Sequence, residues 1–154
     1  MTERNMGITF TCLQFRDLSL EQLYTLLSLR VDVFVVEQQC PYPEIDGKDA
    51  DAWHMMGHDP AGQLLAYARV LPEHGDEAAH IGRVVVKKEA RGSGLADELM
   101  QQCFALLERL YGSRKNAIAA QAYLERFYRG HGYRTISAPY DWDGIPHIDM
   151  VHEG

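Results

Sequence analysis

Residues 80–100, HIGRVVVKKEARGSGLADELM, are the stretch that decides the fold of this chain. An apolar run at 81–86 with three consecutive valines is typical of a strand that is buried on both faces. From about Ser93 onward, apolar residues recur at every third or fourth position, which predicts an amphipathic helix. A buried strand that leads through a short turn into a helix indicates an α/β protein.

The turn itself, Arg91-Gly92-Ser93-Gly94, has the composition of an anion-binding site. Glycine lets the backbone turn sharply and approach a ligand closely. The first amides of the following helix have no partner within it, and they bind phosphate groups at the positive end of the helix dipole. A dinucleotide fingerprint does not fit, because Asp97 occupies the place of its third small residue, and the Gly-Lys-Ser/Thr of a P-loop is absent. The alternative is that the two glycines serve only the geometry of the turn.

Composition limits the classes of function. The 154 residues predict a single domain over 1–154, and 46% apolar with 24% charged residues is ordinary for a globular protein. The formal net charge of -7 argues against nucleic acid or an anionic membrane as the main partner. No signal-peptide pattern and no apolar run of about 20 residues is found, which predicts a cytoplasmic protein.

The sequence predicts no metal site. Cys12, Cys40 and Cys103 are far apart, so they suggest neither a disulfide framework nor a metal-binding Cys-x-x-Cys. His54 and His58 could share one face of a strand, but no third ligand follows at a suitable spacing.

Hydrophobic periodicity and turn residues predict the remaining elements. Ser19, with Gln22 three residues later, forms a capping box that begins a helix. Residues 37–51 are a long loop. The order indicates a mixed α/β sheet with helices on both faces. We expect helices at 19–35, 93–111 and 124–129, and strands at 8–15, 52–58, 63–71, 79–88, 117–122, 133–138 and 147–152.

Two segments carry the signatures of a known family. Residues 91–96, RGSGLA, match the Arg/Gln-x-x-Gly-x-Gly/Ala signature of the GNAT acetyltransferase superfamily, with the strand residues Val84 and Val86 before it. Residues 122–133, AYLERFYRGHGY, resemble the family's Phe-Tyr-x-x-x-Gly-Phe/Tyr segment, in which a tyrosine, here Tyr128, faces the sulfur of acetyl-CoA. The predicted order of elements is also the GNAT order. The chain is therefore identified as a member of this superfamily.

Further segments resemble the ElaA-like branch of the superfamily: residues 30–38 (RVDVFVVEQ), 40–49 (CPYPEIDGKD) and 143–150 (DGIPHIDM). The Arg-x-x-Val-Phe-x-x-Glu pattern in the first is also similar to acyl-homoserine lactone synthases, which share the fold, so a lactone-synthase-like acyltransferase is a minor alternative. The resemblance implies an α/β (α+β) GNAT fold, with a mixed, mostly antiparallel central sheet of six to seven strands and helices on both faces.

The resemblance also implies acetyl-CoA as co-substrate, no metal, and acetyl transfer to a primary amine by direct attack in a ternary complex. The turn amides would hold the diphosphate, and the strand would pair with the pantetheine arm. Many family members carry asparagine where this chain has Gln121, so its contact with the cofactor is open. The implied cofactor-binding residues are Val84, Val85, Val86, Lys88, Arg91, Gly92, Ser93, Gly94, Leu95, Ala96, Gln121 and Tyr128.

Amine acetylation needs an acid and a base. Tyr128 is the candidate general acid, since a phenol of pKa ~10 can protonate a thiolate whose thiol has a pKa of ~8.5. A primary ammonium of pKa ~10 is only about 0.1% neutral at pH 7, so a base or desolvation must help. Glu37 and His147 are the candidate bases.

The loop at 37–51 carries five carboxylates against one lysine, which favours attraction of a cationic acceptor. Glu37, Glu44, Asp46 and Asp49 are therefore candidate substrate-binding residues; the alternative is a solvated acidic connection. The acceptor is predicted only as a small cationic amine or a protein amine, and a homodimer is a further expectation from the family. A second hypothesis is a non-catalytic module that binds or senses acyl-CoA.

Overall fold

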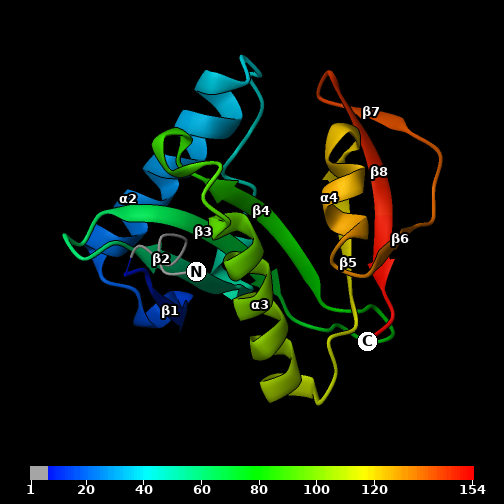
Figure 1. Ribbon diagram of the computed structural model, residues 1–154, viewed down its shortest axis with the longest axis horizontal. Helices are drawn as coiled ribbons and strands as arrows, with labels where there is room; N and C mark the ends of the chain where they lie inside the picture. Colours follow the sequence, from blue (N-terminus) through cyan, green and yellow to red (C-terminus); the bar gives the residue numbers. More distant parts are fainter. Residues whose placement is uncertain (1–6) are drawn as a thin grey trace.

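One mixed sheet of eight strands runs through residues 7–154, which are the part of the chain that the computed structural model describes (Figure 1). The strands follow the order β1-β2-β3-β4-β5-β8-β6, and β7 pairs with β8. Neighbours are antiparallel except β4 and β5, which confirms the predicted mixed, mostly antiparallel sheet. The strands are β1 (Thr9–Gln14), β2 (Trp53–His58), β3 (Leu64–Leu71), β4 (His80–Val86), β5 (Asn116–Gln121), β6 (Tyr133–Thr135), β7 (Tyr140–Trp142) and β8 (Ile145–His152).

The prediction of six to seven strands omits β7. This strand forms a hairpin with β8 around Asp143-Gly144, where both residues have positive φ, 53° and 84°. A two-residue turn of this kind matches the twist of the paired strands, so it holds the short β7 against β8. The strand predicted at 133–138 ends already at Thr135, because beyond it the hydroxyl of Ser137, rather than a backbone carbonyl, accepts the hydrogen bond from a β8 amide.

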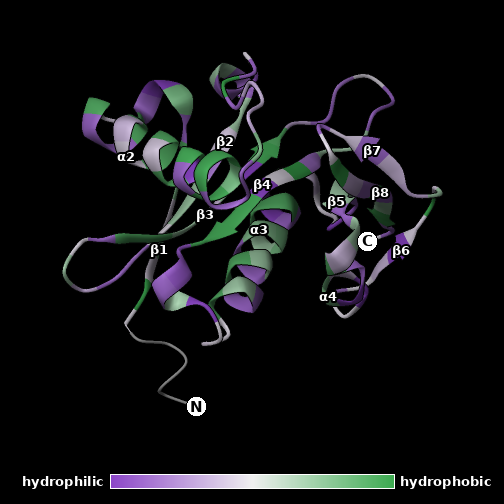
Figure 2. Ribbon diagram, turned by 90° about the horizontal axis from the view of Figure 1, so that it is seen from above, coloured by the Kyte–Doolittle hydropathy of each residue, from purple (hydrophilic) through white to green (hydrophobic). Residues whose placement is uncertain are grey.

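Helices cover both faces of the sheet, with α2 on one face and α3 and α4 on the other (Figure 2). The predicted capping box begins α2, since Ser19 and Gln22 each bond the other's backbone amide. None of the described helices is long and apolar enough to cross a membrane. The helices are α2 (Leu20–Arg30), η2 (Val31–Glu37), α3 (Leu95–Tyr111) and α4 (Glu125–Arg129), with short 3-10 turns η1 (Phe15–Asp17), η3 (Asp49–Asp51), η4 (Lys88–Ala90) and η5 (Ala122–Leu124).

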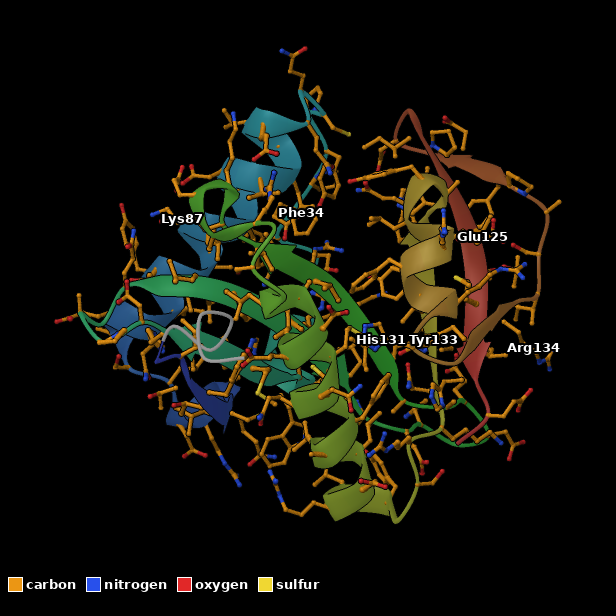
Figure 3. All side chains as sticks on the ribbon, in the orientation of Figure 1. Phe34, Lys87, Glu125, His131, Tyr133 and Arg134 are labelled. Carbon is orange, nitrogen blue, oxygen red and sulfur yellow. The ribbon has the colours of Figure 1, made fainter. Side chains whose placement is uncertain are left out.

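The segment η2 continues α2 as a π-helix and carries the chain two residues beyond the predicted helix end. It contains four valines, whose branched side chains crowd an α-helix. Widened turns of this type occur often at functional sites. Figure 3 shows Phe34 of η2 beside β4.

Apolar side chains form a core on each face of the sheet. Successive residues of a strand point to opposite faces, so Met55 and Ala68 pack in the core beneath α3 while Met56 and Tyr67 pack in the core beneath α2. Each helix thereby buries its apolar side against the same strands from opposite directions.

The parallel strands β4 and β5 meet only at one end. Their single backbone pairing joins His80 to Ala117, and from there the strands diverge (Figure 1). Each strand therefore leaves one edge of its backbone without a strand partner along the gap.

Candidate active site

A cleft of about 570 Å³ occupies the gap between β4 and β5. Ala96 and Tyr128 line it from the face of α3 and α4, whereas Phe34 and Arg69 line it from the face of α2, so the cleft passes through the sheet. The sequence-predicted residues that line it are Glu37, Val84, Val85, Val86, Arg91, Ala96, Gln121, Tyr128 and His147. Those that do not are Glu44, Asp46, Asp49, Lys88, Gly92, Ser93, Gly94 and Leu95.

The backbone amides of residues 92–97 have no hydrogen-bond partner within residues 7–154. Gly92 and Gly94 have φ of 81° and 83°, in the left-handed region that glycine adopts at little cost. Gly94 is the N-cap of α3 and has no side chain to cap it, and the hydroxyl of Ser93 donates to the carbonyl of Ala90 instead, at 2.7 Å. The first amides of α3 are thus left open to an anion.

Arg91 joins this turn to the other side of the cleft. Its Nε donates to the carbonyl of Val86 at 2.9 Å, and its two terminal nitrogens bond the carboxylate of Glu37 at 2.6 and 3.0 Å. The hydrogen bonds from Arg91 lower the pKa of Glu37. Glu37 is therefore a weaker base than an unpaired carboxylate.

A bulge interrupts β4 where it crosses the cleft. Tyr67 faces Val85 and Arg69 faces Gly82, so β4 has one residue more than β3 between these two pairs. Arg83 is in the left-handed region, with φ of 50°, which a residue other than glycine adopts rarely. Such a conformation persists only where the surroundings hold it, and the guanidinium of Arg83 is held by a buried carboxylate at 2.8 Å.

Tyr128 lies on α4 within the cleft, with only 6% of its surface exposed. Its ring packs edge-on against Phe127 and Tyr133, at centroid distances of 5.0 and 5.7 Å. Burial raises the pKa of its phenol, so the hydroxyl stays protonated at neutral pH. In the part of the chain that is described, the hydroxyl has no hydrogen-bond partner.

His147 lines the cleft from β8. Its Nδ1 is 2.7 Å from the carbonyl of Ile145, and because a carbonyl can only accept, Nδ1 carries the proton. In the neutral ring Nε2 is then an acceptor. Trp142 packs against the ring at 5.1 Å between centroids, which helps to fix its orientation.

Gln121 is paired across the cleft. Its side-chain amide and that of Gln38 donate to each other at 3.1 and 3.2 Å, which joins the end of η2 to the end of β5. Two residues after Gln38, the thiol of Cys40 donates to the carbonyl of Asp143 at 3.0 Å. The Gln121–Gln38 pair therefore connects the two halves of the sheet. A contact between Gln121 and the cofactor would require these two hydrogen bonds to break.

The carboxylates expected to attract a substrate are paired inside the protein. Arg30 bonds Glu44 at 2.6 Å and Asp49 at 2.7 Å, and Arg69 bonds Asp46 at 2.8 Å. Burial alone would raise the pKa of Asp46 and Asp49, but hydrogen bonds from Arg69 and Arg30 lower it, so both stay ionised. We call this group the arginine–carboxylate cluster: Arg30, Glu44, Asp46, Asp49, Arg69 and Arg83.

This cluster corrects two expectations. Glu44, Asp46 and Asp49 do not line the cleft, and their charges are matched by three arginines, so the argument that they attract a cationic acceptor does not hold. The alternative of a solvated connection is also wrong at Glu44 and Asp49, which are 4% and 7% exposed.

His54 belongs to the same buried region. Its Nε2 donates to the carbonyl of Asp49 at 2.9 Å, and its Nδ1 accepts from the hydroxyl of Tyr67 at 2.6 Å. Both nitrogens are used, so His54 is not free to bind a metal. Across residues 7–154, no three His, Cys, Asp or Glu side chains are grouped to hold a metal ion.

The three arginines of the arginine–carboxylate cluster, Arg30, Arg69 and Arg83, were not predicted from the sequence as site residues. A signal was present, because each stands among apolar residues of a predicted helix or strand, and arginine is rarely buried unless it is paired. Their partners lie in the loop at 37–51, and only the fold brings the two together.

Comparison with known proteins gives consistent matches. Residues 16–153 match the family model described as acetyltransferase (GNAT) domain. ElaA of Escherichia coli strain K12 is 41% identical over 144 residues, which are 92% of this chain and 94% of that protein. The crystal structure of Escherichia coli ElaA superposes with a TM-score of 0.88 at 40% identity, covering 95% of this chain and 99% of that one.

Two further solved structures are similar to this chain, the first in sequence and fold and the second in fold. The crystal structure of an acyl-CoA N-acyltransferase from Pseudomonas aeruginosa has a TM-score of 0.87 and 43% identity, covering 94% of this chain and 99% of that one. A CoA-dependent acyl-homoserine lactone synthase, solved with SAM and isopentyl-CoA, has a TM-score of 0.79 but 15% identity, covering 94% of this chain and 82% of that one. The second is a likeness of fold alone.

Proposed function

The chain belongs to the GNAT acetyltransferase family and is an acyltransferase, and from this premise we propose that it transfers an acetyl group from acetyl-CoA to a primary amine by direct attack in a ternary complex. The observation that carries the proposal is the cleft through the sheet, which holds the protonated hydroxyl of Tyr128 and is lined at the turn with open amides by Arg91 and Ala96.

The diphosphate is assigned to the start of α3. The unpartnered amides of residues 92–97 are donors for its oxygens, with Arg91 at the edge and Lys88 available to the ribose phosphate. A diphosphate competes with Glu37 for Arg91, so that cofactor binding loosens this ion pair. The open backbone edge of β4 pairs with the pantetheine arm.

The reacting carbonyl is assigned to the bulge in β4. The extra residue there removes backbone groups from the ladder, so an amide near Val84 donates to the oxyanion that forms during attack. Tyr128 then protonates the departing thiolate. Burial keeps the proton on the phenol at neutral pH, and the same burial makes a thiolate that forms beside it a stronger base, so the proton transfer remains possible.

His147 is the base that the geometry favours over Glu37. Its Nε2 is an acceptor, whereas the carboxylate of Glu37 is bound by Arg91 and its pKa is lowered. Of the two protons that an ammonium loses on acetylation, one leaves through His147 to solvent, and one restores the proton that Tyr128 gives to the thiolate. The products are the N-acetyl amine, CoA thiol and one proton, so no other reactant is required.

Replacement of Tyr128 by phenylalanine tests the proposal. Tyr128→Phe removes the acid and leaves the ring, so we expect kcat to fall about 100-fold or more while the acetyl-CoA Kd stays unchanged. CoA release against a panel of amines gives kcat, and calorimetry gives Kd.

Tyr133→Phe is the matched control. Its hydroxyl donates to Asn116 at 2.7 Å in the core, so this change lowers stability by about 1 kcal/mol and leaves kcat unchanged. Equal kcat for Tyr128→Phe and wild type would remove the acid from the mechanism. Tight acetyl-CoA binding, with no CoA release in the presence of any amine of the panel, would favour the non-catalytic binding module.

A further inference from the structure

The two sides of the cleft differ in what they offer a ligand. The open amides and Tyr128 are on the face of α3 and α4, and the bulge at residues 83–84 is where the cleft passes through the sheet. An acetyl group held at the bulge leaves the part of the cleft on the α2 face for the acceptor. We call this part the acceptor half.

The acceptor half is lined by charged side chains of both signs. Lys48, Arg69 and Arg83 line it, against the single unpaired acidic side chain of Asp143. Glu37 also lines the cleft, and it is paired with Arg91 until a diphosphate competes for that arginine. The cleft therefore presents cationic donors that the acidic composition of residues 37–51 does not predict, together with the carboxylate of Asp143.

The carboxylates of the arginine–carboxylate cluster do not face the ligand, whereas Arg69 and Arg83 do. They lie behind the arginines and do not line the cleft, and three carboxylates are matched by three arginines. Lys48 adds one more positive charge, and its ammonium forms no ion pair with any residue from 7 to 154.

Asp46 bonds both the backbone of Lys48 and the side chain of Arg83. One oxygen of that carboxylate accepts from the backbone amide of Lys48 at 3.1 Å, and the other accepts from Arg83 at 3.3 Å. Arg83 uses Nε and Nη2 for its internal partners, and its Nη1 has none among the described residues. Two cationic donors are therefore available to one anionic group, one residue away from the proposed oxyanion donor near Val84.

We infer that the acceptor is an amine that also carries a carboxylate a few bonds from the attacking nitrogen, that is, a free amino acid, and that Lys48 and Arg83 bind this carboxylate. The inference rests on the proposed function. The acceptor amine then faces His147 as its base, and Asp143 is the acidic group available to it before deprotonation. Leu71, Trp142 and Ile145 supply apolar walls, so an apolar side chain fits this half.

Matched sets of acceptors test the inference. Leucine is compared with leucinamide and 3-methylbutylamine, and phenylalanine with phenylalaninamide and phenethylamine, each with acetyl-CoA and CoA release as the readout. We expect kcat/KM for the free acid to exceed that of its amide and its amine by about tenfold or more, since the amide and the amine lack the anionic group. Equal or higher kcat/KM for the amides or amines would overturn the inference while the acetyltransferase function stands.

Substitutions that change the charge at position 48 test whether Lys48 is responsible for the preference for the free acid. Lys48→Gln should raise KM for leucine about two- to fivefold, and Lys48→Glu about tenfold or more, with KM for acetyl-CoA unchanged. Lys115→Gln, at an exposed lysine in the connection between α3 and β5, is the control and should change neither constant. An unchanged KM for leucine in both Lys48 variants would overturn the inference.

Binding separates a failure of this inference from a failure of the proposed function. Calorimetry of leucine and leucinamide is carried out on protein saturated with CoA, where no transfer occurs. Binding of leucine but not of leucinamide, without turnover in the first assay, would retain the carboxylate site and reject the acetyltransferase function. No preference for leucine in either assay would reject the carboxylate site.

Discussion

The turn at residues 91–96 and the loop at residues 37–51 both concentrate charged and turn-forming residues, yet they use their polar groups in opposite ways. Amides 92–97 have no partner among residues 7–154, whereas Glu44, Asp46 and Asp49 are each bound by an arginine of the same chain. A buried polar group that is satisfied internally contributes to architecture, and one that is left open is available to a ligand. Charge in the sequence does not distinguish the two cases.

Glu37 connects these two regions. It is the one carboxylate of the loop that meets the turn, through Arg91, and the only one of the predicted substrate-binding carboxylates that lines the cleft. Substitutions in the cluster, in the turn and at Glu37 are therefore expected to have three different outcomes.

The largest effect is expected in the arginine–carboxylate cluster. Arg30 is fully buried, and Arg30→Ala leaves Glu44 and Asp49 without their shortest ion pairs, so we expect a loss of about 3–5 kcal/mol in the free energy of unfolding. Urea denaturation measures it. Arg126→Ala, at an exposed arginine of α4, should stay within about 0.5 kcal/mol of wild type. A loss below about 1 kcal/mol for Arg30→Ala would mean that the cluster is not structural.

The second effect is expected at the turn. Gly94→Val forces a β-branched residue into the left-handed region and displaces the first amides of α3, so we expect the acetyl-CoA Kd to rise about 100-fold, or about 2.7 kcal/mol. Gly112→Val is the control, because Gly112 ends the same helix with φ of 72° and is strained to a similar degree. Calorimetry should show a changed Kd for the first variant only. Retained affinity in Gly94→Val would show that the diphosphate binds elsewhere.

The smallest effect is expected at Glu37. Glu37→Gln removes the charge that competes for Arg91, so the acetyl-CoA Kd should fall about two- to fivefold, as for a partly exposed ion pair. Glu108→Gln breaks a comparable pair with Arg114 at the other end of α3 and should leave Kd unchanged. A kcat about 100-fold lower in Glu37→Gln would instead identify Glu37 as the general base and exclude the assignment to His147.

Much of the fold follows from local patterns. The capping box at Ser19, the valine run of β4 and the periodicity of α3 each specify an element through neighbours in the sequence, and these elements are found where they were expected. The short β7 was missed, because a three-residue strand has too little pattern of its own and depends on its turn and on β8.

The candidate site, like the fold, is in part predictable from local sequence and in part decided by tertiary contacts. The sequence of residues 91–96 and the tyrosine at 128 was sufficient to predict both the GNAT family and the location of the turn at the start of α3. The pairing of Glu37 with Arg91, of Gln121 with Gln38 and of the loop carboxylates with Arg30, Arg69 and Arg83 was decided by the tertiary structure alone. Glycine and a helix start determine open amides locally, but whether a charge is neutralised depends on partners that only the folded chain brings within a few ångströms.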